Sequence, residues 1–207
     1  YNALISPIYF AVVIMLIYLT QSLQVYLASE KEKQEVRGAF GRYLSPVLVE
    51  QLANDPTMLR LGGEMRQVTV LFCDIRGFTR ISEQLAPEEL TQLLNRFLTP
   101  LTEVILNEQG TIDKYMGDCI MAFWNAPVNV PHHEDHACRA ALQMLEALEH
   151  LNRSLQHEAK GSGRTAHALK MGIGINSGSV LAGNLGSEQR FDYSILGDSV
   201  NLASRLE

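Results

Sequence analysis

Residues 68–79 read V-T-V-L-F-C-D-I-R-G-F-T, and this stretch decides how the rest of the chain is interpreted. Its first part is β-branched, aliphatic and aromatic, a composition typical of a buried strand. Gly77 then allows backbone angles that other residues resist, which predicts a turn directly after the strand. Asp74 is therefore expected where the strand ends, a position at which a carboxylate can face solvent or a ligand.

Further predicted elements follow this strand at 68–73. Apolar residues recur at three- and four-residue steps between 86 and 107, which predicts a helix with one face in the core. The glycines of 172–183 lack the order of a nucleotide-binding motif, and they are expected to allow a tight hairpin. The remaining pattern predicts a strand pair at 110–124, a helix at 134–157, strands at 168–176, 179–185 and 190–196, and a last helix after Gly197.

The N-terminal segment has a different composition. Residues 3–19 carry no charged side chain, at the lower limit of the roughly 17–25 residues that span a bilayer, and continuation to residue 27 lengthens the span. Basic residues follow from Lys31 onward, which predicts a cytoplasmic C-terminal side. We expect a transmembrane helix at 1–27, with a buried or docked terminal helix as the alternative. A helical coupling segment at 28–60 and a globular domain at 61–207 would follow.

Bulk composition excludes several classes of protein. The net charge of −6 gives no signal for binding a polyanion, so nucleic acid is not an expected partner. Cys73, Cys119 and Cys138 are odd in number and lack C-x-x-C spacing, which favours reduced thiols over a disulfide framework. Residues 132–136 read H-H-E-D-H, and we interpret these histidines as part of a helix start rather than as zinc ligands.

A second aspartate occupies a position like that of Asp74. Residues 111–124 read T-I-D-K-Y-M-G-D-C-I-M-A-F-W, two apolar strands joined by a tight turn that contains Asp118. Carboxylates on turns at the ends of strands can converge, and such a pair suits Mg²⁺ or Mn²⁺. Aspartate is also a common turn and cap residue, so the spacing alone leaves both interpretations open.

Three motifs together resemble one family. F-C-D-I-R-G-F-T at 72–79, D-K-Y-M-G-D-C-I-M-A-F-W at 113–124 and F-D-Y-S-I-L-G-D-S-V-N-L-A-S-R-L-E at 191–207 resemble the class III nucleotidyl cyclases, of the bacterial membrane-anchored adenylyl type. The resemblance covers about residues 60–207. It implies an α+β fold: a ferredoxin-like βαββαβ cyclase catalytic domain, with an antiparallel-dominated sheet, helices on one face and an N-terminal membrane helix. The family usually continues past Glu207, so domain 61–207 is expected to be truncated at its C-terminus.

The resemblance also implies roles for individual residues. Asp74 and Asp118 match the metal-binding aspartates, and the carbonyl of Ile75 matches a backbone ligand, for two Mg²⁺ or Mn²⁺ ions per site. Lys114 matches the position that recognises the purine, where lysine is typical of adenylyl cyclases and glutamate of guanylyl cyclases. Ser194 occupies the second purine-selecting position, at which the family usually has aspartate or threonine. Its hydroxyl can still accept a hydrogen bond from the adenine amino group.

Asn201 and Arg205 match the pair that positions the ribose and stabilises charge on the reacting phosphate. Their four-residue spacing places both on one face of the last predicted helix. Arginine keeps its charge at any relevant pH and offers a planar set of donors to phosphate oxygens.

The implied function is conversion of ATP to 3′,5′-cyclic AMP and pyrophosphate in signal transduction, by two-metal-assisted attack of the ribose 3′-hydroxyl on the α-phosphate. The family architecture implies a homodimer with shared active sites, anchored in the plasma (inner) membrane with the catalytic domain in the cytoplasm. Two alternatives stay open: a guanylyl or relaxed-specificity cyclase, and a catalytically silent nucleotide-binding or dimerisation module of a membrane receptor.

Overall fold

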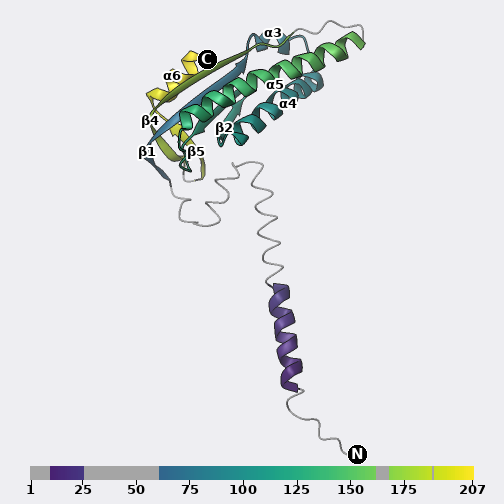
Figure 1. Cartoon of the computed structure of the whole chain (residues 1–207), viewed down its shortest axis with the longest axis vertical. Coiled ribbons are helices and arrows are strands. Elements are labelled where there is room, and N and C mark those ends of the chain that lie inside the picture. Colours follow the sequence, from purple (N-terminus) through teal and green to yellow (C-terminus); the bar gives the residue numbers. More distant parts are fainter. Residues whose placement is uncertain (1–9, 26–60, 162–167, 188) are drawn as a thin grey trace, which may run out of the picture. The chain divides into compact units, whose positions relative to one another are not determined.

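The computed structural model describes residues 10–25, 61–161, 168–187 and 189–207, and the chain forms two compact units, Tyr1–Ala53 and Asn54–Glu207 (Figure 1). In the first unit, residues 10–25 form a helix with exposed side chains. Among the described residues, no helix combines the length and the apolar character needed to cross a membrane. The other parts of the predicted membrane helix, 1–9 and 26–27, and the predicted coupling segment 28–60 lie outside the described residues. The membrane helix and the coupling segment therefore stay predictions.

The second unit has the predicted βαββαβ order with further elements added. Its five strands form one antiparallel sheet in the order β2-β3-β1-β4-β5. The predicted α+β architecture is confirmed, and the short helix α3 was not predicted. The elements are β1 Gly62–Ile75, α3 Phe78–Ser82, α4 Pro87–Asn107, β2 Thr111–Met116, β3 Cys119–Trp124, α5 His133–Gly161, β4 Met171–Ser187, β5 Arg190–Leu196 and α6 Asp198–Leu206.

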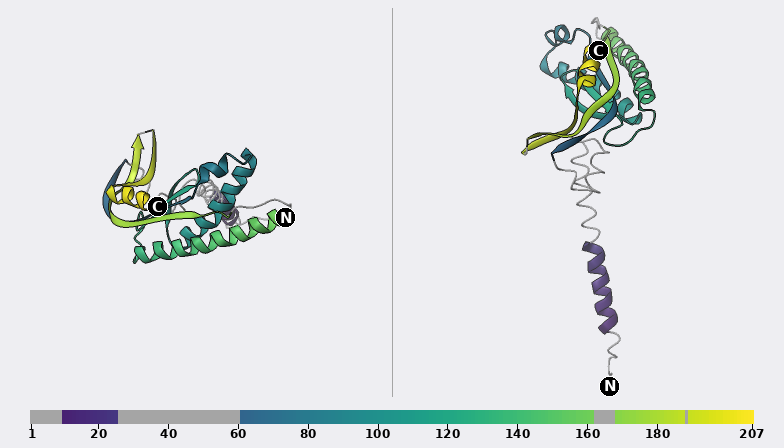
Figure 2. Two further views of the ribbon diagram at one scale, coloured as in Figure 1. Left: turned by 90° about the horizontal axis from the view of Figure 1, so that it is seen from above. Right: turned by 90° about the vertical axis from the view of Figure 1, so that its left-hand side faces the viewer.

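The two faces of β1 pack against different helices. Leu71 and its neighbours on one face belong to a core cluster with residues of α4 and α5. Val70 and Phe72, on the other face, pack in a second cluster that includes Val200 and Ala203 of α6. Figure 2 shows α5 and α6 on opposite sides of β4. The expectation that the helices cover one face of the sheet is therefore wrong for α6, because α6 has its own buried apolar side.

Strand β4 also differs from the prediction. The sequence predicted two strands, 168–176 and 179–185, joined by a hairpin, whereas β4 is one strand that pairs with β1 from Met171 to Asn184. The glycines serve helix packing instead. A Cβ atom on Gly174 would collide with the carbonyl oxygen of Ala203, and one on Gly178 would collide with the hydroxyl of Ser199. Glycine in this strand therefore allows α6 to lie close to the sheet.

Candidate active site

The predicted metal ligands come together at the end of β1. Asp74 and Ile75 are the last two residues of this strand, and Asp118 lies in the turn between β2 and β3, where Gly117 has a φ of 69°. The backbone N–H of Ile75 donates a hydrogen bond to Oδ2 of Asp118 at 2.9 Å. Oδ1 of Asp74 is buried and has no hydrogen-bond partner. The sequence correctly predicted Asp74 at the end of a strand and Asp118 in a turn. The structure adds the hydrogen bond that connects this strand end to this turn.

Negative charge is concentrated at this point. Burial raises the pKa of Asp118, the N–H of Ile75 opposes this shift, and the nearby charge of Asp74 adds to it. Burial also raises the pKa of Glu207, as do a hydrogen bond to Asp74 and its charge. Arg76 compensates in part, because its Nη1 forms an ion pair with Oε1 of Glu207 at 3.1 Å. Sequence reasoning had missed Glu207, the last residue of the motif at 191–207, to which it gave no role.

These residues fit a divalent cation. The buried, unpartnered oxygen of Asp74 is an available hard ligand, and a cation would relieve its repulsion with Asp118. Within the described ranges, no group of three or more His, Cys, Asp or Glu side chains has a metal-binding arrangement. A cation at this point would therefore take one or two carboxylates and complete its coordination with other oxygens, as Mg²⁺ often does with substrate phosphates.

The two predicted purine-binding residues are also brought together, although β2 and β5 are the outer strands of the sheet. Asp113 connects them. Oγ of Ser194 donates to Oδ2 of Asp113 at 3.1 Å, and Nζ of Lys114 lies 3.5 Å from the same oxygen. The Asp113 side chain is 0% exposed, whereas that of Lys114 is 47% exposed. Sequence reasoning had missed Asp113, for which the available signal was an aspartate inside a strand, where that residue is uncommon.

Asn201 and Arg205 lie on α6, as predicted. Both are exposed, and Nε of Arg205 donates to the backbone carbonyl of Asn201 at 3.3 Å. In the part of the chain that the structure describes, no hydrogen bond or ion pair links these two side chains to Asp74 or Asp118. Within one chain, the two carboxylates and the Asn201–Arg205 pair are therefore separate groups.

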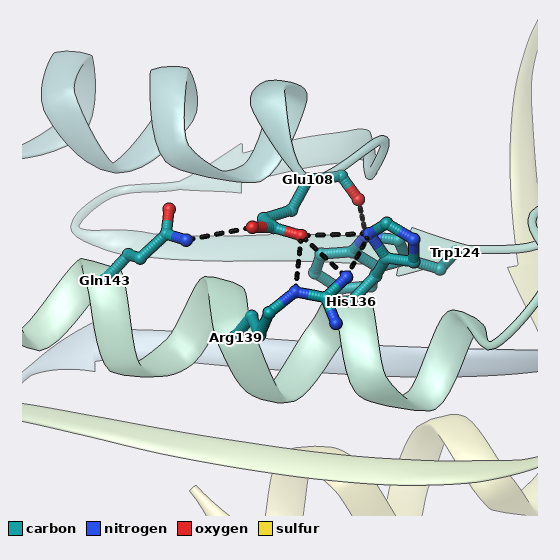
Figure 3. Close-up of polar contacts among 5 residues, drawn as sticks. All are labelled: Glu108, Trp124, His136, Arg139 and Gln143. Carbon is teal, nitrogen blue, oxygen red and sulfur yellow. Dashed lines mark hydrogen bonds and ion pairs between the residues drawn. The ribbon is translucent and has the colours of Figure 1, made fainter.

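A second polar cluster joins the end of α4 to α5 (Figure 3). Glu108 accepts hydrogen bonds from Arg139 at 3.2 Å and from Gln143 at 2.9 Å, and it lies 2.9 Å from Nδ1 of His136. The Glu108 carbonyl accepts from Nε1 of Trp124 at 2.8 Å. His136 therefore has a structural partner, in agreement with the interpretation of residues 132–136 as part of a helix start.

Comparison with known proteins identifies the family. Residues 63–207 match the adenylate and guanylate cyclase catalytic domain, and the chain belongs to this family. Adenylate cyclase 1 of Rhizobium meliloti (strain 1021) is 39% identical over 142 residues, which cover 69% of this chain and 20% of that protein. The chain therefore spans only about a fifth of the length of this curated relative.

Two solved structures share the fold. The guanylyl cyclase Cya2 matches with a TM-score of 0.63 and 40% identity, over 70% of this chain and 71% of that chain. The adenylyl cyclase CyaB from P. aeruginosa matches with a TM-score of 0.61 and 40% identity, over 70% of this chain and 73% of that chain. One is named a guanylyl cyclase and the other an adenylyl cyclase, so family membership alone does not select the purine.

Proposed function

We propose that the protein is an adenylyl cyclase that converts ATP to 3′,5′-cyclic AMP and pyrophosphate. The observation that carries the proposal is the meeting of Asp74, Ile75 and Asp118 at one end of the sheet, with a buried carboxylate oxygen left without a partner. Membership of the cyclase family gives this cluster its interpretation.

Each of the predicted site residues has a separate role in the proposed reaction. Mg²⁺ or Mn²⁺, two ions held by Asp74, Asp118 and the Ile75 carbonyl, would favour the deprotonated ribose 3′-hydroxyl and neutralise phosphate charge. Arg205 supplies a permanent positive charge for the phosphate during displacement, and Asn201 holds the ribose so that its hydroxyl faces the α-phosphate.

Purine recognition supports ATP as the substrate. Lys114 donates to a ring nitrogen of adenine, and the Ser194 hydroxyl accepts from the adenine amino group. A carboxylate in place of Lys114 would instead suit the donor edge of guanine. The second candidate function is a guanylyl or relaxed-specificity cyclase, which is favoured by serine at position 194 and by the likeness to Cya2.

The assembly that we propose is a homodimer with shared sites. Asp74 and Asp118 of one protomer would face Lys114, Ser194, Asn201 and Arg205 of its partner, consistent with the separation of the carboxylates from the α6 pair within one chain. We also propose that residues 1–27 anchor the protein in the plasma (inner) membrane, with the catalytic domain in the cytoplasm and residues 28–60 as the coupling segment. Deletion of residues 1–27 should then move the protein from the membrane fraction to the soluble fraction.

The test is turnover of ATP and GTP by the full-length protein with Mg²⁺ or Mn²⁺, measured as cyclic product. Asp74→Ala serves as the inactive control and Asp135→Asn, at an exposed position in the first turn of α5, as the matched active control. Cyclic AMP that requires the metal and disappears only in Asp74→Ala supports the proposal. A folded protein that forms cyclic GMP alone would make it a guanylyl cyclase, and no cyclic product from either nucleotide would favour a silent binding module.

A further inference from the structure

We propose that Asp113 is a positioning residue that sets purine selectivity, because it fixes the Ser194 hydroxyl as a hydrogen-bond acceptor toward the substrate. The inference rests on the proposed cyclase function and adds a residue to its specificity. Asp113 is the only residue within hydrogen-bond or ion-pair distance of both Lys114 and Ser194 among those that the structure describes.

The backbone places Asp113 at an irregularity of the sheet. The register between β2 and β3 shifts between Ile112 and Lys114, so Asp113 is the extra residue of a bulge. In a regular strand, neighbouring side chains point to opposite faces, whereas a bulge redirects one of them. This irregularity is consistent with Asp113 and Lys114 lying together at 3.5 Å, although they are adjacent in sequence. Strand β4 is bent (Figure 2), and the hydrogen bond between Ser194 and Asp113 joins β5 to β2.

The direction of one hydrogen bond then decides which purine group fits. A serine hydroxyl has one proton and two acceptor lone pairs, and an ionised carboxylate can only accept. Oγ of Ser194 donates its proton to Asp113 at 3.1 Å. Burial raises the pKa of Asp113, and the ammonium group of Lys114, with its Nζ 3.5 Å from Oδ2, opposes that rise and favours the ionised carboxylate. Only lone pairs of Ser194 remain for a substrate. They suit the amino group at C6 of adenine and repel the carbonyl oxygen at C6 of guanine.

The same contact also has a purely structural explanation. The Asp113–Ser194 hydrogen bond joins strands β2 and β5, the two outer strands of the sheet, and would stabilise its curvature. Removal of a hydrogen bond that is only structural lowers the stability of the protein, but it does not change the preference for ATP over GTP. The ratio of ATP to GTP therefore separates the two explanations.

The experiment measures kcat/KM for ATP and for GTP in the wild type, Asp113→Asn, Ser194→Ala and the double variant, together with thermal stability. Asparagine presents a donor and an acceptor, so the hydroxyl of Ser194 loses its fixed direction. We expect the ATP:GTP ratio to fall about tenfold or more in Asp113→Asn, the factor that about 1.4 kcal/mol gives. Because Asp113 acts through Ser194, the double variant should show the same ratio as Ser194→Ala. Glu146→Gln removes a charge from an exposed position of α5 and should leave the ratio unchanged.

A ratio within about twofold of the wild type in Asp113→Asn would overturn the inference, and so would a further fall of the ratio when Asp113→Asn is added to Ser194→Ala. If Asp113→Asn does not fold, Ser194→Ala tests the inference instead. An unchanged ATP:GTP ratio in Ser194→Ala would show that Ser194 does not select the purine, and Asp113 could then not act through it. Equilibrium dissociation constants for ATP and GTP give a separate measure of the preference, without turnover. A wild-type protein without cyclase activity would contradict the proposed function. A wild-type protein that binds ATP and GTP equally well would instead contradict the role of Asp113.

Discussion

At the scale of single residues, Asp74 is a carboxylate whose hydrogen bonding is incomplete. Its buried Oδ1 has no hydrogen-bond partner. Burial raises the pKa of Asp118 and of Glu207, and the charge of Asp74 adds to both shifts. A buried carboxylate without a full set of partners is costly, because it has lost hydration that the protein does not replace. A site of this kind destabilises the fold unless a cation occupies it.

Asp74→Asn should therefore stabilise the protein in the absence of divalent ions. Asparagine keeps the shape and removes the charge, so we expect a higher midpoint of thermal unfolding than in the wild type when EDTA is present. Added Mn²⁺ should raise the midpoint of the wild type, because a ligand that binds the folded state stabilises it, and should leave the variant unchanged. Cyclase activity of the variant should fall at least about a hundredfold.

Differential scanning fluorimetry with and without Mn²⁺ measures these shifts, and Asp192→Asn controls for the loss of a negative charge elsewhere. A variant that keeps the full shift with Mn²⁺ would show that Asp74 does not bind the ion.

At the scale of elements, α6 depends on the glycines of β4. Alanine at Gly174 would bring a Cβ atom against the backbone of Ala203 and Glu207, so α6 must move away from the sheet. We expect Gly174→Ala to cost about 1–3 kcal/mol of unfolding free energy. It should also lower kcat by about a hundredfold, because a small displacement of Asn201 and Arg205 disturbs their alignment with substrate.

Urea denaturation and turnover measure the two effects of Gly174→Ala. Ser179→Ala, at an exposed position of the same strand, should change both quantities little. Full activity in Gly174→Ala would show that the position of α6 is not required.

The contact between α4 and α5 predicts a pH dependence of stability. Burial alone raises the pKa of Glu108, but hydrogen bonds from His136 and Gln143 and the charge of Arg139 together lower it below its usual value. A lowered pKa in the folded state means that the stabilisation is present above the unfolded pKa of about 4.3 and is lost as pH falls through the folded value. Glu108→Gln should therefore cost about 1–2 kcal/mol at pH 7, and this difference should shrink as pH falls below about 4.

Urea denaturation of the wild type and Glu108→Gln at several pH values measures the change. Glu149→Gln removes an exposed carboxylate that pairs with Arg153 at 3.2 Å, and it should cost less than about 0.5 kcal/mol. A Glu108→Gln effect that is independent of pH would contradict the assigned cause.

The sequence correctly predicted the elements whose packing follows from their own pattern of apolar residues. The run around Leu71 is apolar on both faces, and β1 is covered by helices on both faces. The glycines of β4 were predicted to form a hairpin, because glycine occurs both in turns and at sites of close packing. Which of the two applies depends on α6, which follows later in the chain. The contact between Asp113 and Ser194 could not be predicted for a similar reason, because it joins residues that are 81 positions apart.

At the scale of the whole molecule, a single sheet carries two separate groups of predicted site residues. The end of β1 holds Asp74 beside Asp118, and the curved sheet brings Lys114 close to Ser194 through their shared contact with Asp113. In a two-fold dimer of identical chains, a contact between one group of a chain and a different group of its partner is repeated by symmetry. The proposed dimer would therefore unite the carboxylates of one chain with the predicted purine-binding residues of the other, twice in each dimer.

Mixing inactive variants tests this arrangement. Asp74→Ala and Asn201→Ala should each be inactive alone, because every site of either homodimer lacks one group. Mixed in equal amounts and allowed to exchange protomers, they should recover about one quarter of wild-type activity, since half of the dimers are mixed and each of these has one intact site of two. Asp74→Ala mixed with Asp118→Ala should recover none, because both changes affect the same half-site. No recovery in the first mixture despite proven exchange would show that the carboxylates and Asn201 act within one chain. Recovery in the control would show that the Asp74 and Asp118 of one site come from different chains, which would also contradict the arrangement.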